Sequence, residues 1–213
     1  MTRNKNDAYF TPPALTCVLI DRLEASSDWW GPNAEDDNGF PIRKRVIAEP
    51  CGGDNWISRV CTNRGYQVIT GDIDPDRPVH YPGVDIFNKR ANKVYAGADA
   101  IITNPPFSGA PLYVRRSLEL AGRVAMLLRV TFLEPCESQL KSARADLLKS
   151  LDRVIVLPRV SFYQGKRGTD SATCAWFIWE SRRVNPTTIL EVVSEAELAE
   201  AAGQQRLFSE VGT

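Results

Sequence analysis

Residues 98–109 read Ala-Asp-Ala-Ile-Ile-Thr-Asn-Pro-Pro-Phe-Ser-Gly, and this stretch decides the expected fold. Its first half is a short apolar run with the length and composition of a buried strand. The strand must end at Asn104, because the two prolines that follow fix φ and cannot donate to a sheet ladder. Gly109 precedes a helical pattern over 110–121. A buried strand that passes through a polar loop into a helix is the repeating unit of a parallel sheet covered by helices.

The same unit recurs on both sides of this stretch, after a first helix that Pro12-Pro13 opens. The expected strands are 45–48, 66–70, 84–87, 98–103, 123–130, 154–157 and 175–179. The helices expected between them are 55–64, 110–121 and 134–150. The last two strands have no helix between them, which favours an antiparallel hairpin at one edge. The sequence therefore predicts an α/β, Rossmann-like fold with a mostly parallel seven-stranded sheet and a C-terminal antiparallel hairpin.

Length and composition are those of one globular domain. The chain has 213 residues, 43% of them hydrophobic. We expect a domain over 1–182, with a surface loop at 26–44 that is rich in Gly, Pro and Asn, and a C-terminal tail over 183–213. Lys and Arg total 26, as do Asp and Glu, so the formal net charge is zero. Nucleic-acid contacts would therefore depend on local basic patches.

Several classes of protein are excluded by what the sequence lacks. No apolar run approaches a membrane span, and the polar first residues do not form a signal peptide, so we expect a cytoplasmic protein without membrane contact. The five cysteines are widely spaced and His80 is the single histidine. This pattern argues against a disulfide framework and against a metal site.

Unusual residues follow three of the expected strands, where parallel sheets bind ligands. Glu49, Cys51, Gly52 and Gly53 lie in the first such loop. Paired glycines allow a tight turn and close approach of a ligand to the backbone, and the carboxylate can hold an ammonium group. This loop is equally compatible with a plain turn between strand and helix.

Two aspartates fit an adenosine-containing ligand. Asp72-Ile73 ends the second expected strand, where a carboxylate can accept both hydroxyls of a ribose. Asp85-Ile86 follows the third, where a carboxylate can accept from an adenine amino group beside an apolar wall. Aspartates are also common in turns.

Asn104-Pro105-Pro106-Phe107 carries the strongest chemical signal. The Asn104 side-chain oxygen and the Pro105 carbonyl can together accept both hydrogens of an exocyclic amino group. That arrangement directs the lone pair of the nitrogen outward, toward an incoming methyl group. Phe107 offers a flat apolar face for stacking a base.

With these residues the chain resembles the S-adenosylmethionine-dependent N6-adenine methyltransferases of the class I fold. Asn104 to Phe107 match the catalytic tetrad of that family. The residues that match its cofactor-binding positions are Phe10, Thr11, Glu49, Cys51, Gly52, Gly53, Asp72, Ile73, Asp85, Ile86 and Asn104. The loop at Cys51-Gly52-Gly53 departs from the commoner small-Gly-x-Gly form. The resemblance covers about residues 9–180 and implies S-adenosylmethionine as cofactor.

The order of the motifs is similar to the gamma arrangement of DNA methyltransferases. Members of that group usually carry a sizeable target-recognition domain, and no segment here is large enough to be one. The resemblance therefore implies a DNA adenine N6-methyltransferase with low or short sequence specificity, of the small type found in phages and mobile elements. RNA adenine, a protein glutamine, or a catalytically silent fold that binds nucleic acid remain alternatives, because the same tetrad suits any planar amino or amide nitrogen.

Two segments are candidate partner contacts. Lys166-Arg167, in a Gly-flanked loop of the expected hairpin, is the best candidate for contacting nucleic-acid phosphates. Near the C-terminus, Gln204, Leu207 and Phe208 form a Gln-x-x-Leu-Phe pattern that resembles the peptide with which bacterial replication and repair proteins bind the sliding clamp. A terminal helix that docks on its own domain explains the same pattern.

Overall fold

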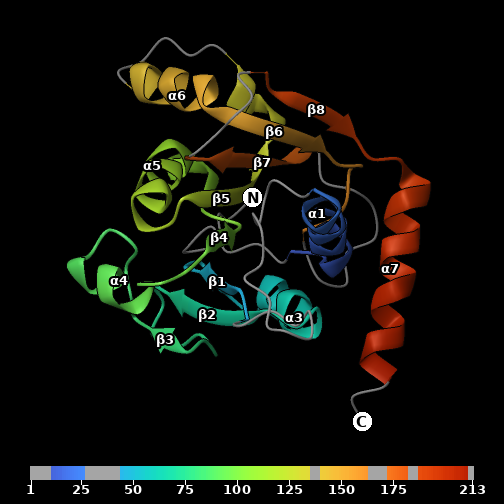
Figure 1. Cartoon of the computed structure of the whole chain (residues 1–213), viewed down its shortest axis with the longest axis horizontal. Coiled ribbons are helices and arrows are strands. Elements are labelled where there is room, and N and C mark those ends of the chain that lie inside the picture. The colour runs from blue at the N-terminus through green and yellow to red at the C-terminus, as the bar shows by residue number, and fades with distance from the viewer. Residues whose placement is uncertain (1–10, 27–43, 135–139, 163–171, 182–186, 211–213) are drawn as a thin grey trace, which may run out of the picture.

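The computed structural model describes residues 11–26, 44–134, 140–162, 172–181 and 187–210. The chain forms one eight-stranded sheet with helices on both faces (Figure 1). The strands are β1 (Val46–Glu49), β2 (Gln67–Asp72), β3 (Tyr81–Pro82), β4 (Ala100–Thr103), β5 (Arg123–Arg129), β6 (Leu151–Val156), β7 (Cys174–Glu180) and β8 (Ile189–Val192). The helices are α1 (Pro13–Ala25), α3 (Trp56–Asn63), α4 (Lys89–Val94), α5 (Ala110–Leu120), α6 (Leu140–Lys149) and α7 (Glu195–Glu210), with short 3-10 turns at Phe107–Gly109 and Val130–Leu133.

The strand order is β3-β2-β1-β4-β5-β7-β6-β8. The first five strands in this order run parallel, and β7 lies antiparallel between β5 and β6. The mostly parallel sheet with antiparallel pairing near the C-terminus is therefore confirmed. The order reverses between β1 and β4, so the loops after these two strands lead to opposite faces of the sheet.

Two details of the strand prediction were wrong. Residues 84–87 are not a strand, because the Asp85 side chain accepts from Phe87 N–H at 2.9 Å and so closes a turn, and the short β3 lies just before them. The sheet also has an eighth strand. β8 pairs in parallel with β6, although its sequence falls in the segment expected to be a tail.

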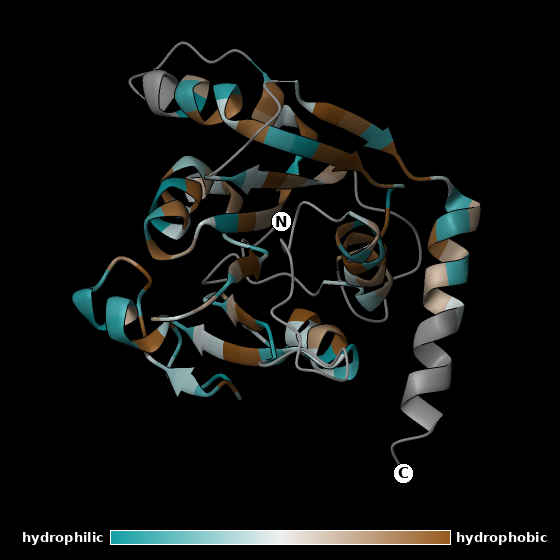
Figure 2. Ribbon diagram, viewed as in Figure 1, coloured by the Kyte–Doolittle hydropathy of each residue, from teal (hydrophilic) through white to brown (hydrophobic). Residues whose placement is uncertain are grey.

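The helices form two layers with separate apolar cores. Helices α1, α3 and α7 cover one face, and α4, α5 and α6 cover the other (Figure 1). Along β4, Ala100 and Ile102 belong to the first core and Ile101 to the second, as the alternation of a strand requires. Figure 2 shows hydrophobic residues along both the strands and the helices that pack on them. No helix among the described residues combines the length and the apolar composition needed to cross a bilayer.

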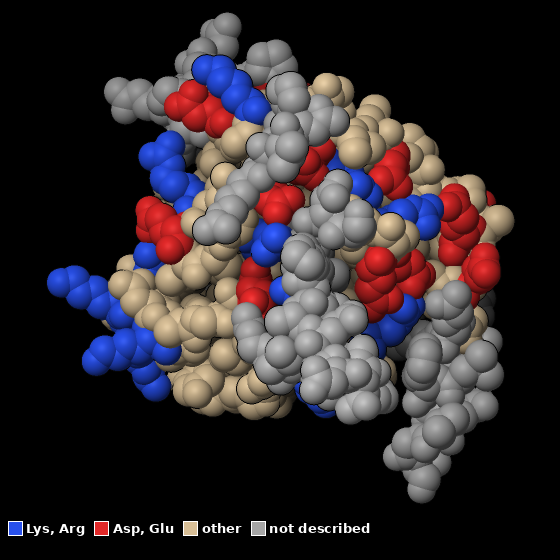
Figure 3. Space-filling view, in the orientation of Figure 1, with Lys and Arg blue, Asp and Glu red and all other residues tan. Residues whose placement is uncertain are grey.

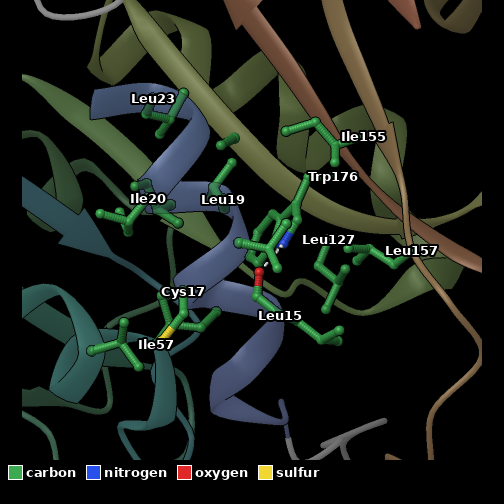
Figure 4. Close-up of a cluster of buried hydrophobic side chains, with 14 of the residues drawn as sticks. Leu15, Cys17, Leu19, Ile20, Leu23, Ile57, Leu127, Ile155, Leu157 and Trp176 are labelled. Atoms are coloured by element: carbon green, nitrogen blue, oxygen red, sulfur yellow. Dashed lines mark hydrogen bonds between the residues drawn. The ribbon is translucent and has the colours of Figure 1, made fainter. Parts of the chain in front are cut away.

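Helix α1 is buried on nearly all sides (Figure 4). Leu15 and Leu19 are fully buried between the sheet and its neighbouring helices. The indole N–H of buried Trp176, on β7, donates to the Leu15 carbonyl at 2.8 Å. This bond fixes the start of α1 against the middle of the sheet, and with it the residues that precede the helix.

Helix α7 packs along α1, and Arg22 joins three elements at this contact. Its guanidinium lies 3.0 Å from Glu191 on β8 and 2.5 Å from Glu197 on α7. Residues 187–202 therefore belong to the same packed unit as the sheet, beyond the boundary at 182 that the sequence suggested.

Glycines let the loop after β1 approach β2 closely. Gly52 N–H donates to the Gly71 carbonyl at 2.9 Å. A Cβ atom on Gly52 would lie 2.8 Å from Val79 Cγ1, and one on Gly71 would lie 2.1 Å from the Tyr95 hydroxyl oxygen. Both positions exclude a side chain because neighbouring atoms already fill the space.

The contact between Gly71 and Tyr95 predicts that a second substitution restores stability lost by the first. We expect Gly71→Ala to lower the free energy of unfolding by about 3 kcal/mol, since the added methyl overpacks a closed site. Tyr95→Phe removes the clashing oxygen, which is buried without a hydrogen-bond partner among the described residues. The double variant should recover part of the loss in urea denaturation. If the changes in unfolding free energy caused by Gly71→Ala and by Tyr95→Phe simply add in the double variant, the assigned contact is incorrect.

Candidate cofactor and substrate site

A cleft opens at the carboxyl ends of β1, β2 and β4, where the strand order reverses. It contains about 600 Å³ of space free of protein atoms, part of it open to solvent. Its lining residues are Pro50, Cys51, Gly53, Asp72, Ile73, Asp74, Arg77, Val84, Asp85, Ile86, Asn104, Pro106 and Tyr113. The cleft therefore brings together most of the residues predicted to bind the cofactor and two of the tetrad.

The turn after β1 forms one wall of the cleft. Gly53 has φ +50° and Asn55 has φ +64°, so two residues in this turn adopt the left-handed conformation. The turn directs Gly53 N–H toward Asp72, whose Oδ2 accepts it at 2.9 Å. This hydrogen bond joins the loops after β1 and β2 at the site.

The two predicted aspartates both face the cleft with their carboxylates oriented by backbone N–H groups. Asp72 Oδ1 accepts from Asp74 N–H at 2.9 Å, and Asp85 Oδ1 accepts from Phe87 N–H at the same distance. Each carboxylate oxygen has more than one lone pair, so both groups can still accept from a ligand. Ile73 and Ile86 line the cleft beside them and provide apolar surface.

Asn104 lies at the end of β4 with an unusual pattern of hydrogen bonds. Its Nδ2 donates to the Thr11 hydroxyl at 3.0 Å. Its Oδ1 is shielded from solvent and has no partner among the described residues. A buried acceptor without a partner is costly in a folded protein. This oxygen is therefore available to a donor on a ligand.

Phe107 is half-buried and lies beside an arginine that the sequence did not single out. The guanidinium of Arg129, at the end of β5, sits 5.0 Å from the centre of the Phe107 ring. Arg129 is exposed and makes no ion pair with any residue that the structure describes. One face of this ring thus carries a cation at the edge where β4 and β5 end.

Glu49 lies deeper than the resemblance implies. It is 2% exposed, and its Oε2 accepts from Ser58 N–H in the first turn of α3 at 2.9 Å. Burial raises the pKa of the Glu49 carboxyl well above its usual value, while the bonds from Ser58 oppose the shift. Glu49 is not among the residues that line the cleft. In the structure it acts as a buried cap on α3.

Other predicted residues lie outside the lining or outside the description. Gly52 is buried behind the loop, where its role is the close approach to β2. Phe10, Lys166 and Arg167 lie outside the described residues. Helix α7 continues through 204–208, so the backbone of the clamp-like peptide is helical, but its side chains are likewise outside the description.

Sequence reasoning missed one contact and five lining residues, which are Pro50, Asp74, Arg77, Val84 and Tyr113. Tyr113 on α5 and Arg77 after β2 reach the cleft from segments without a motif. Val84 was expected in a strand and instead lines the cleft. The Thr11–Asn104 bond joins positions 93 residues apart, which no local pattern can reveal.

Comparisons with known proteins identify the fold. No protein-family model and no curated protein matches the sequence. Among solved structures, the type IIG restriction endonuclease BpuSI is similar, with a TM-score of 0.62 and 14% identity over 100% of this chain and 30% of that one. A modification subunit of a putative type I restriction enzyme from Vibrio vulnificus YJ016 has a TM-score of 0.53 and 14% identity over 94% of this chain and 53% of that one.

A third similar structure is covered over more of its own length than the first two. It is a putative class I S-adenosylmethionine-dependent methyltransferase from Listeria monocytogenes, with a TM-score of 0.60 and 13% identity over 95% of this chain and 70% of that one. The chain has the class I methyltransferase fold. At this level of identity the likeness extends to the fold alone, and the chain spans less than two thirds of each of the first two proteins.

The buried Glu49 predicts a pH-dependent stability. Because the pKa of Glu49 is raised in the folded state, its contribution to folding stability is fully present below the unfolded-state pKa of about 4.3. This contribution is lost as the pH rises through the folded-state pKa. Glu49→Gln keeps an acceptor for Ser58 N–H and cannot ionise. We therefore expect wild type to lose stability relative to this variant as the pH rises, measured by urea unfolding from acid to neutral pH. Exposed Glu195→Gln is the control. A constant difference across the range would contradict the assignment.

Proposed function

We propose that this chain transfers a methyl group from S-adenosylmethionine to the exocyclic amino group of adenine in DNA, at N6. The observation that carries the proposal is the unpartnered Asn104 Oδ1 beside a cleft lined by Asp72 and Asp85. An amino group is the donor that this acceptor lacks. The fold and the two carboxylates support an adenosine-containing methyl donor in the same cleft.

The residues present fit that cofactor. All four of these residues line the cleft, where Asp72 would accept from ribose hydroxyls, Asp85 would accept from the adenine amino group, and Ile73 and Ile86 would contact the purine. The glycine turn after β1 allows close approach of the ligand. When bound, the cofactor supplies an activated methyl group on its sulfonium.

The tetrad positions the nitrogen that receives the methyl group. Asn104 Oδ1 and the Pro105 carbonyl accept the two amino hydrogens, and neither proline has an N–H group that could compete. As the nitrogen becomes positive, these oxygens stabilise the charge. The main contribution of the chain is thus orientation and electrostatic stabilisation.

A nucleic-acid substrate is supported by the stack of Arg129 on Phe107. A base that stacks on Phe107 would bring its phosphates near an arginine without an ion-pair partner among the described residues. Elsewhere, charges of both signs are mixed on the face shown in Figure 3, apart from a basic edge over α4. That edge includes Lys89, Arg90 and Lys93.

We favour DNA over RNA because two of the similar structures are named as a restriction endonuclease and as a modification subunit of a putative restriction enzyme. Nucleoside analysis of DNA and RNA from cells expressing the protein decides between them. N6-methyladenine in DNA supports the proposal. The modification in RNA alone, or in neither nucleic acid, would contradict the proposal.

Asn104→Ala should separate catalysis from cofactor binding. We expect kcat to fall by a factor of about 100 or more, because an acceptor that acts on developing charge is lost. Affinity for S-adenosylmethionine, measured by calorimetry, should persist in this variant and fall in Asp72→Ala. Asn63→Ala, at an exposed position on α3, is the matched control. An equal loss of cofactor affinity in Asn104→Ala and Asp72→Ala would place Asn104 in the cofactor site instead.

Arg129→Gln should weaken DNA binding in a salt-dependent manner. Loss of one phosphate contact reduces the slope of log K against log salt by about one. Lys149→Gln removes the same charge from α6 and should leave the slope unchanged, since Lys149 pairs with Asp146 on the helix surface. Fluorescence anisotropy over a salt series measures both. Equal slopes in Arg129→Gln and wild type would remove Arg129 from the interface.

A further inference from the structure

We infer that Thr11 is a positioning residue, whose hydroxyl holds the Asn104 amide in the orientation that presents its oxygen to the substrate. The inference rests on the proposed function and assigns a role outside the tetrad. The resemblance to methyltransferases implies a different role for Thr11, namely a contact with the cofactor. The structure places Thr11 behind Asn104, and it is not among the residues that line the cleft.

The two ends of an asparagine amide differ in the hydrogen bonds that they can make. The oxygen only accepts hydrogen bonds, and the nitrogen only donates them. An amino group that will receive a methyl must donate its hydrogens, so it can bind Oδ1 and is repelled by the NH2 group. The reaction therefore requires one of two amide orientations that are nearly equal in shape.

Thr11 provides the acceptor that this orientation needs. Its hydroxyl oxygen receives the Nδ2 hydrogen at 3.0 Å, and the residue is 4% exposed, so solvent does not replace it. If the acceptor were lost, Nδ2 would be left without a partner in a buried place when Oδ1 binds the substrate. The productive orientation would then be disfavoured by the cost of an unsatisfied donor.

The backbone around Thr11 keeps this oxygen in place. Pro12 has φ −55° and begins the approach to α1, where Leu15 N–H donates to the Pro12 carbonyl at 3.0 Å. Trp176 fixes the same residue, Leu15 in the first turn of the helix, to the sheet (Figure 4). A rigid hydroxyl thus meets a side chain that projects from the end of β4. This is the type of support that a preorganised site requires.

The test compares Thr11→Val, which keeps the shape but removes the acceptor, with Thr11→Ser, which keeps the hydroxyl. We expect Thr11→Val to lower kcat by about 10- to 100-fold, the range for an unsatisfied buried donor, with the affinity for S-adenosylmethionine unchanged. Thr11→Ser should restore most of kcat. Thr11→Ala is measured in parallel so that the comparison does not depend on the folding of one variant.

A double-mutant cycle shows whether Thr11 acts through Asn104. In the Asn104→Ala background, Thr11→Val should cause no further loss of kcat. Additive losses, or a Thr11→Ser variant as impaired as Thr11→Val, would overturn the inference. A weakened affinity for the cofactor with kcat unchanged would assign Thr11 to the cofactor instead.

A measurement without substrate separates this inference from the proposed function. The side-chain NH2 signals of Asn104 in a 15N-labelled sample are identified by their absence in Asn104→Ala. We expect their exchange with solvent to be slow in wild type and Thr11→Ser and faster in Thr11→Val. Equal exchange rates in wild type and Thr11→Val would contradict the positioning role. The exchange rates test the role of Thr11 even if wild type transfers no methyl group to any nucleic acid. That absence of transfer would refute the proposed function and leave the positioning role of Thr11 to be decided by the exchange rates.

Discussion

The reversal of strand order between β1 and β4 is the constraint on which the site depends. Because the chain leaves these two neighbouring strands toward opposite faces, their loops diverge and a cleft opens between them. The divergence can be held only if each loop is anchored elsewhere. The loop after β1 is anchored to β2 through Gly52 and Gly71, and the loop after β4 is anchored to the start of α1 through Asn104 and Thr11. The first anchor is a backbone hydrogen bond between two glycines, and the second is a hydrogen bond between two short side chains.

The buried helix α1 connects this edge to the rest of the core. Its apolar side chains fill the space between the sheet, α3 and α7, and the Trp176 bond to Leu15 sets its depth. A shift of α1 along its axis would move Thr11 relative to Asn104 and would also break buried contacts on several sides. The start of α1, about one turn of helix, therefore links the packing of the core to the orientation of the Asn104 amide. For the same reason, we expect substitutions that disturb the packing of α1 to disturb the Thr11–Asn104 contact at the carboxyl ends of the strands, even when they lie far from the cleft.

Much of this arrangement is predictable from the sequence because it is encoded locally. An apolar run before Asn104-Pro105-Pro106 predicts a buried strand and its end, and most strands and helices follow from the same reasoning. The errors occur where local patterns are weak. The Val84–Phe87 segment is apolar enough for a strand, but an Asp85 side chain that accepts from Phe87 N–H forms a turn instead. β8 has only four residues, of which three are exposed, so its membership of the sheet depends on pairing with β6.

The candidate site shows the same division between local and distant information. Residues after strands 1, 2 and 4 could be grouped at one edge because parallel strands end together, and the cleft does contain Cys51, Asp72 and Asn104. Contacts between side chains that are distant in sequence follow no such rule. Arg129 on Phe107 and Thr11 on Asn104 arise from the packing of different elements. Glu49 illustrates the converse: its position at a strand end suggests a ligand contact, but the first turn of α3 offers Ser58 N–H to the same carboxylate. In the structure this carboxylate is 2% exposed and accepts from the helix, and its contact with a ligand stays a prediction.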